Sequence, residues 1–382
     1  MGIVASVCAG EPVMPGLPRW DAVALSFLPT AINGSRIIGT RNGAPVQGSG
    51  PGDPTPLPLL GGVSGPYNPV DLSSNGVALG STSNIDFPGV LWTSSLQTVP
   101  MGRAPHGFFV PRAVNSSVVV VGTSDDAELA FRWTPNAVGY RDLIPPAGFS
   151  DPQATDVNDA GFAVGTVSNS SGRAVVRWTS DGTPAVLATL VTAGMRGGPF
   201  IRNNGDVTWA EIGLIKSWNG VTTTVPSPDG FERLTGVSES GRLIGTLVSG
   251  GERRGWTSFQ GDTWVEFDVL DPPAAQPGDF FEPTAVNFCG DIVGVVHRAD
   301  GTTSGLIFAK SSDTDCDGPL ETDPLEADIE AFTVDVGGER PVTVTFTPIS
   351  PVAVTGTLTM NGNDPDEPRL SVPLVGEGRT NE

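Results

Sequence analysis

The feature that most constrains the fold is a repeat with a period of about 42 residues. In each copy a short apolar segment leads to a turn, and an apolar strand then ends at glycine, as in residues 154–165 (ATDVNDAGFAVG). The pattern occurs seven times, ending at Gly39, Gly80, Gly122, Gly165, Trp209, Gly245 and Gly294. Successive end points are 41, 42, 43, 44, 36 and 49 residues apart. Periods of this length are typical of propeller blades or of linear arrays.

Each copy from the second onward has a further anchor, an aromatic residue 9 to 14 residues after the end point. These residues are Trp92, Trp133, Trp178, Trp218, Trp256 and Phe308. Turns such as Asp181-Gly182 follow, and they supply the positive φ angles that two-residue hairpins require. The pattern predicts four short antiparallel strands per repeat, the size of one blade. Because each aromatic residue recurs on the same strand, we expect it to pack in the core between blades.

The seven repeats predict an all-β fold, a seven-bladed β-propeller over residues 17–310. The first repeat has a Pro- and Gly-rich stretch, residues 43–65, where the Trp strand is expected. Trp20 lies upstream, so we expect residues 20–29 to supply outer strands to the last blade, which ends at Lys310. Such closure protects the edges of the sheets. An open array of β-hairpin units is the alternative.

The distribution of charge places a boundary near residue 310. The chain carries 42 acidic and 21 basic residues, a net charge of −21, and residues 311–382 hold 15 of the acidic and 3 of the basic ones. We therefore expect an unassigned segment 1–16, the propeller, an acidic linker 311–328, a β module 329–378 and a tail 379–382. In the module, Val342, Val344 and Phe346 alternate with threonines, as in half-buried antiparallel strands. The prediction is a small immunoglobulin-like β-sandwich, short for a complete domain.

Two stretches of sequence resemble known families. The repeats resemble the HAF repeat of extracellular bacterial proteins, A-x-x-I-N-x-x-G-x-x-V-G followed by an aromatic-Trp strand, and residues 130–133 (AFRW) come nearest to its His-Ala-Phe tripeptide. Residues 356–368 (GTLTMNGNDPDEP) and 372–378 (VPLVGEG) resemble the end of the Hydin-type immunoglobulin-like domain. These resemblances imply an extracellular propeller and a spacer or interaction module, without shared catalytic residues.

The acidic linker contains a candidate calcium site. Asp313, Asp315 and Asp317, followed by glycine, match the start of a calcium loop, D-x-D-x-D-G. The twelfth position of such a loop holds a bidentate acid, but here it is Pro324, and Glu321 is the substitute that we expect. The alternative is a solvated acidic linker without bound metal.

Two tryptophans outside the regular pattern are candidate ligand residues. Trp209 replaces the repeat glycine and Trp264 lies outside the aromatic series, and exposed indole rings can stack on sugars.

Catalytic signatures are few. The chain has two histidines, His106 and His297, and lacks a nucleophile elbow, a zinc-protease helix motif or a phosphate-binding glycine loop. We therefore expect no enzymatic activity. The alternative is a secreted polysaccharide hydrolase or lyase that uses carboxylates in propeller loops, such as Asp125 with Asp126 or Asp156 with Asp159.

Composition limits the partners and the compartment. Only two residues are lysine and no basic patch occurs, which argues against nucleic acid. No run of 18 apolar residues predicts a transmembrane helix, and the N-terminal residues lack a secretory signal pattern. Cys8, Cys289 and Cys316 fit no zinc spacing and are too few for a disulfide framework. Together with the resemblances, this predicts a secreted or cell-surface bacterial protein that binds a protein or carbohydrate through its propeller loops.

Overall fold

The computed structural model describes residues 20–103, 105, 107–124, 129–135, 139–190, 194–259, 263–267 and 278–310, and the backbone of four strands beyond them. The chain divides into two compact units, residues 1–317 and 318–382, which are described separately. Among the described residues no helix is long and apolar enough to cross a membrane.

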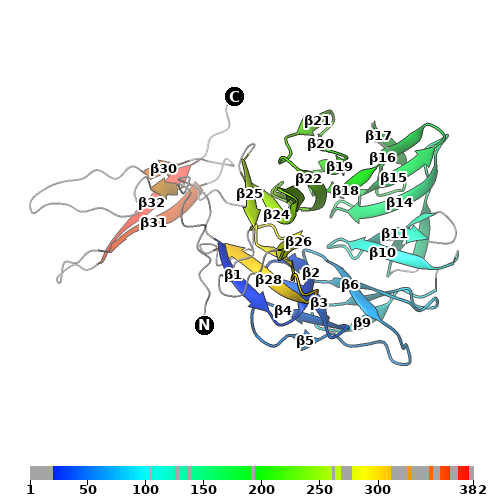
Figure 1. Ribbon diagram of the computed structural model, residues 1–382, viewed down its shortest axis with the longest axis horizontal. Coiled ribbons are helices and arrows are strands. Elements are labelled where there is room, and N and C mark those ends of the chain that lie inside the picture. The colour runs from blue at the N-terminus through cyan, green and yellow to red at the C-terminus, as the bar shows by residue number, and fades with distance from the viewer. Residues whose placement is uncertain are drawn as a thin grey trace, which may run out of the picture. The chain divides into compact units, whose positions relative to one another are not determined.

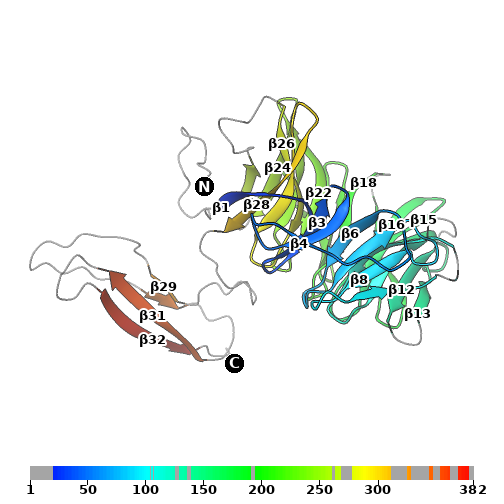
Figure 2. The same cartoon turned by 90° about the horizontal axis from the view of Figure 1, so that it is seen from below.

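The described residues of the first unit form seven four-stranded antiparallel sheets arranged as a ring of blades (Figures 1 and 2). Each innermost strand contacts the innermost strand of the next blade, and the seventh contacts the first. The architecture is therefore a seven-bladed β-propeller, as the repeat predicts, and not an open array.

In blades 1 to 6 the strands follow chain order from the innermost strand outward, and in blade 7 the first described strand of the chain is outermost. Blades 1 to 3 comprise β2 (Leu28–Asn33), β3 (Arg36–Arg41), β4 (Ala44–Gly48) and β5 (Thr55–Pro56); β6 (Tyr67–Leu72), β7 (Ala78–Thr82), β8 (Gly89–Trp92) and β9 (Thr98–Pro100); β10 (Phe109–Val114), β11 (Val120–Ser124), β12 (Ala130–Thr134) and β13 (Gly139–Leu143). Blades 4 and 5 comprise β14 (Ser150–Val157), β15 (Ala163–Asn169), β16 (Gly172–Trp178) and β17 (Pro184–Thr189); β18 (Met195–Ile201), β19 (Val207–Glu211), β20 (Leu214–Trp218) and β21 (Thr222–Val225). Blades 6 and 7 comprise β22 (Phe231–Val237), β23 (Leu243–Ser249), β24 (Glu252–Phe259) and β25 (Thr263–Phe267); β26 (Phe280–Val286), β27 (Ile292–His297), β28 (Thr303–Lys310) and β1 (Trp20–Leu25).

Strand β1 closes the ring. It pairs with β28 from Trp20↔Lys310 to Leu25↔Gly305, so the first described strand is the outer strand of the last blade. The predicted closure is confirmed for residues 20–25. Leu28 and Pro29, which were expected in the same outer segment, instead begin β2 of blade 1, because the chain crosses to the next blade after Leu25.

The repeat glycine is explained by a bulge in each innermost strand. Gly165 pairs with Ala154, next to an irregularity between Ala154 and Asp156. A Cβ atom on Gly165 would lie 1.8 Å from the carbonyl oxygen of Gln153, a distance that no side chain tolerates. Gly294 is equivalent, because its Cβ would lie 2.2 Å from the carbonyl oxygen of Glu282. The glycine therefore lets the second strand pass the bulged backbone of the first.

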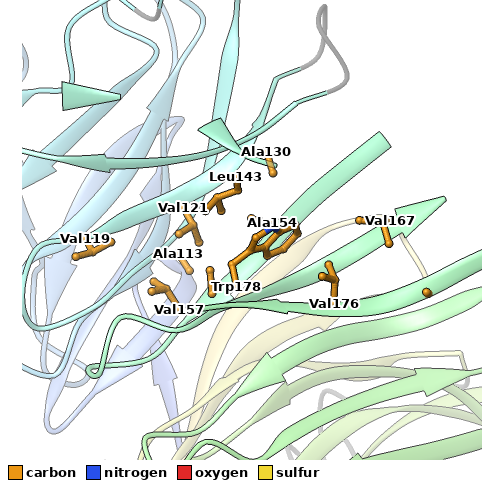
Figure 3. Close-up of a cluster of buried hydrophobic side chains, with 12 residues drawn as sticks. Ala113, Val119, Val121, Ala130, Leu143, Ala154, Val157, Val167, Val176 and Trp178 are labelled. Atoms are coloured by element: carbon orange, nitrogen blue, oxygen red, sulfur yellow. The ribbon is translucent and has the colours of Figure 1, made fainter. Parts of the chain in front are cut away.

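The repeat tryptophans mostly fill the space between blades. Trp178 has no exposed surface and packs with Ala113, Val121 and Leu143 of blade 3 (Figure 3). Its indole Nε1 donates a hydrogen bond to the carbonyl of Ile144 at 2.8 Å. Trp92, Trp133 and Trp256 are also buried, which confirms the core assignment for these strands.

Blade 5 departs from this rule. Trp218 is only half-buried, and its ring lies 4.7 Å from the guanidinium carbon of Arg177. The fully buried ring of this blade is Trp209, which packs against Val164 and Val175 of blade 4. Trp209 thus occupies, from the second strand, the position that the third-strand tryptophan fills elsewhere.

The turn asparagines join neighbouring blades. Asn158 Oδ1 accepts a hydrogen bond from the N–H of Phe162 in its own turn, while Nδ2 donates to the carbonyl of Arg202 in blade 5. Asn115 bonds in the same way to Val119 and to the carbonyl of Asn158. Each asparagine side chain therefore closes its own turn with one hydrogen bond and joins two neighbouring blades with another.

In the second unit, the described backbone forms two antiparallel pairs, β29 (Leu325–Ala327) with β30 (Val344–Phe346) and β31 (Ala353–Asn361) with β32 (Arg369–Glu377). Period-two alternation correctly predicted strands here.

Candidate functional site

A cavity of about 520 Å³ lies where the innermost strands of blades 5, 6 and 7 begin. Such a volume is within the range of small-molecule sites. Its lining consists of Met195, Arg196, Gly197, Gly198, Glu232, Arg233, Thr246, Arg253 and Glu282. Three arginines and two glutamates therefore converge at one end of the ring of blades.

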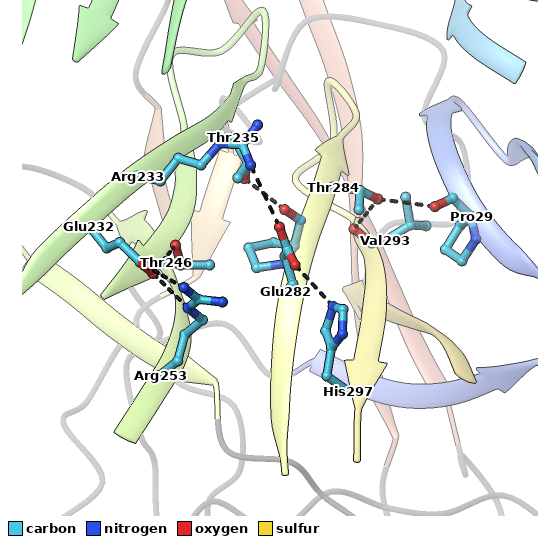
Figure 4. Close-up of polar contacts among 11 residues, drawn as sticks. Pro29, Glu232, Arg233, Thr235, Thr246, Arg253, Glu282, Thr284, Val293 and His297 are labelled. Atoms are coloured by element: carbon cyan, nitrogen blue, oxygen red, sulfur yellow. Dashed lines mark hydrogen bonds and ion pairs between the residues drawn. The ribbon is translucent and has the colours of Figure 1, made fainter. Parts of the chain in front are cut away.

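One wall of the cavity is a fixed ion pair. Arg253 Nε and Nη2 donate hydrogen bonds of 2.8 and 2.5 Å to the two carboxylate oxygens of Glu232 (Figure 4). The Thr246 hydroxyl donates a third bond to Glu232 at 3.0 Å. These bonds, with Arg253 contributing most, lower the pKa of Glu232. Because both carboxylate oxygens of Glu232 accept hydrogen bonds from Arg253, the pair forms a fixed, charged part of the cavity wall.

The opposite wall centres on Glu282 of β26. Its carboxylate is 2.9 Å from His297 Nε2 and 3.9 Å from Arg233 Nη1 (Figure 4). The His297 ring stacks on Phe280, with centroids 4.6 Å apart and an interplanar angle of 8°. The stack and the Glu282 contact fix the orientation of the imidazole.

Two arginines remain available to a ligand. Arg233 is 61% exposed, and its contact with Glu282 is longer than a hydrogen bond. Arg196 is exposed and forms no hydrogen bond or close ion pair with any residue that the structure describes, although its charge acts on Glu232.

A second group of acids lies near the opposite ends of the innermost strands. Asp71 Oδ2 accepts a hydrogen bond from the N–H of Val114, and Asp156 Oδ2 accepts one from the N–H of Ile201, each in the next blade. Burial, and to a lesser extent the charge of Asp71, raises the pKa of Asp156 to about 7. Burial also raises the pKa of Asp71. Each of these carboxylates therefore links its own blade to the next one by a hydrogen bond.

Asp159, which the sequence paired with Asp156, belongs to a surface network at that end. Its carboxylate accepts bonds from the N–H of Ser116 and from Asn203 Nδ2. Burial alone would raise its pKa, but these bonds and one from Ser74 outweigh it and lower the pKa. Both acids of the predicted pair are therefore engaged in contacts between blades.

The tryptophans predicted as ligand residues lie in or beside the core. Trp209 has no exposed surface, so its ring is not presented to a ligand, and burial between blades 4 and 5 explains its departure from the glycine rule. Trp264 is half-buried, and its ring meets that of Trp256 edge-on at 4.7 Å.

The remaining predicted residues are outside the described part of the chain. These are the calcium candidates Asp313, Asp315, Asp317 and Glu321, together with His106, Asp125 and Asp126. Of the described residues that sequence reasoning weighed for chemistry, only His297 is near the cavity, through its contact with the lining residue Glu282. The arginines and glutamates around it were missed, because they come from three blades and follow no local motif.

Cys289 lies in the turn after β26, is 2% exposed and is disulfide-bonded. Its partner lies outside the described residues.

Comparison with a solved structure bears out the propeller part of the predicted fold. Virginiamycin B lyase from Staphylococcus aureus is similar over 76% of this chain and 99% of its own, with 14% identity and a TM-score of 0.52; that structure is of a catalytically inactive histidine-to-alanine variant with quinupristin. YCF48 bound to D1 peptide covers 78% of this chain and 99% of its own, with 14% identity and a TM-score of 0.47. At 14% identity, the likeness to the lyase concerns the propeller fold alone. No protein-family model matches the sequence, and no curated protein matches it.

Proposed function

We propose that this protein is a non-enzymatic binding protein that holds its ligand in the cavity at the start of β18, β22 and β26. The observation that carries the proposal is the convergence of Arg196, Arg233 and Glu282 on one opening of a rigid ring. Loops and strand ends positioned by a stable scaffold are where binding residues concentrate. The ring is stapled between blades by buried polar side chains, so the cavity walls need little reorganisation when a ligand enters.

We further propose a secreted or cell-surface location, with HAF-type repeats and an immunoglobulin-like second unit. The disulfide at Cys289 supports an oxidising compartment, because cytosolic thiols are normally kept reduced. The strand pairs β29–β30 and β31–β32 are compatible with part of a sandwich. Peptide mapping of the natively produced protein without reductant should recover Cys289 in a cross-linked peptide; a free thiol at Cys289 would argue against this location.

The binding proposal is tested by screening the full chain against panels of oligosaccharides and peptides, and measuring each hit by calorimetry. Arg233→Ala should weaken a genuine cavity ligand by about tenfold or more, because a charged hydrogen bond is lost. The control is Arg141→Ala, an exposed arginine on the outer strand of blade 3. A ligand whose affinity is unaffected by Arg233→Ala binds elsewhere, and the cavity assignment fails.

A polysaccharide hydrolase or lyase is the second candidate, and one observation favours it. His297 Nε2 lies 2.9 Å from Glu282 beside the cavity, an arrangement that can orient a general base. Incubation with polysaccharides, followed by measurement of new chain ends, tests this candidate. Turnover that is abolished by His297→Ala would replace the binding proposal.

A further inference from the structure

The cavity presents cations and hydrogen-bond acceptors side by side. Arg196 and Arg233 offer guanidinium donors that are not saturated by tight ion pairs within the described structure. Glu282 and Glu232 lie beside them in the same lining. A ligand must therefore place a negative group at the arginines and donors at the glutamates.

The protein's overall charge restricts the ligand further. With a net charge of −21, the molecule repels anions at a distance, so binding of any anion depends on the arginines of the cavity itself. Inside the cavity, the glutamates would also repel a ligand whose every polar group is an anion. A polyacidic peptide matches this pattern less well, since its side chains supply only carboxylates and its hydrogen-bond donors are confined to the backbone N–H groups.

A uronic acid meets both requirements. Its single carboxylate matches the planar fork of an arginine, and its hydroxyl groups can donate to carboxylate oxygens. A cavity of about 520 Å³ has room for a unit of this size. Resting on the proposed binding function, we infer that the ligand is an acidic polysaccharide, held through the carboxylate of a uronic acid residue by Arg196 and Arg233.

The experiment uses the full chain and trigalacturonate as the probe, with its methyl ester as the uncharged match. Trigalacturonate should bind, and esterification should weaken binding about tenfold or more, because the charge-assisted bonds are lost. Arg196→Gln and Arg233→Gln should each weaken trigalacturonate binding by a similar factor and leave binding of the ester nearly unchanged. Arg141→Gln, remote on blade 3, should change neither.

Each other outcome overturns a distinct statement. Equal affinity for the acid and its ester, or no effect of either arginine substitution, overturns the uronate inference but leaves a binding function. Binding of hexaglutamate without binding of trigalacturonate replaces the sugar with an acidic peptide. If no oligosaccharide or peptide of the wider panels binds, the proposed function fails as well. Circular dichroism of each variant establishes that it is folded, so that loss of affinity is not loss of structure.

Discussion

Asp156 and Asn158 stand two residues apart, and both side chains join blade 4 to blade 5. Asp156 is the more unusual, because desolvation raises the pKa of its carboxyl group from 3.8 to about 7. The folded state therefore holds this proton more tightly than the unfolded state. Its contribution to stability is fully present below about pH 4 and is lost as the pH rises to about 7.

Asp156→Asn removes this titration while keeping an oxygen that can accept from Ile201. The stability of the variant relative to the natural protein should increase by about 3 kcal/mol from pH 4.5 to pH 7.5, since one pKa unit corresponds to about 1.36 kcal/mol. Urea unfolding at both pH values measures the difference. The control, Asp181→Asn at an exposed turn where hydrogen bonds from Thr179 and Thr183 lower the pKa, should show no such gain. Parallel stability curves for Asp156→Asn and the natural protein would contradict the assignment.

Asn158 tests the double role of the turn residue. Asn158→Ser should retain the bond within the turn, as Ser238 does through its hydroxyl at 3.0 Å from Arg242 N, and lose only the bond to blade 5. We expect a cost of about 1 kcal/mol for serine and about 2–3 kcal/mol for alanine, which also leaves the buried turn N–H unpaired. Thermal or urea unfolding gives both values. Equal costs would mean that the bond between blades contributes nothing.

Within a blade, the second strand depends on glycine where it passes the bulge of the first. Gly165→Ala should cost more than about 3 kcal/mol, because the Cβ would overlap the carbonyl oxygen of Gln153 and the strands must separate. Gly61 has open space around it and no left-handed φ, so Gly61→Ala should be within about 0.5 kcal/mol of neutral. The comparison is made by urea unfolding. A mild effect at Gly165 would mean that the bulge relaxes.

The third-strand tryptophans are not equivalent, although the repeat suggests that they are. Trp178→Ala and Trp209→Ala should each cost about 3–5 kcal/mol as buried aromatic truncations, whereas Trp218→Ala should cost clearly less, because its ring is half-buried. Denaturant unfolding of the three variants checks the order. A large cost at Trp218 with a small one at Trp209 would reverse the assignment.

These elements also show what the sequence could predict. Gly165, Asn158 and Trp178 recur because each blade repeats the same contacts, so a local period reveals the strands and their core. The sequence did not predict the role of Trp209. Because Trp209 replaces the repeat glycine, it was interpreted as a binding residue, but its ring is buried. In blade 5 the innermost strand itself carries Gly197 and Gly198, and the ring of Trp209 fills the space between blades. The cavity has no period at all: Arg196, Arg233 and Glu282 meet only when three blades are placed in the ring.

Closure is a property of the whole propeller, and β1 provides it. Removing residues 1–25 would leave β28 with a free edge and remove Ala22 and Leu25, which are 4% and 7% exposed. Unpaired edges recruit other strands, so this truncation should associate or aggregate, and its melting temperature should fall by at least about 5 °C. Removing only residues 1–19 keeps β1 and serves as the control. Light scattering after size-exclusion chromatography and thermal unfolding measure both effects. The contrary result is that the chain without residues 1–25 stays monomeric and keeps its melting temperature. Blade 7 would then be stable with three strands, and the pairing of β1 with β28 would not be what closes the ring.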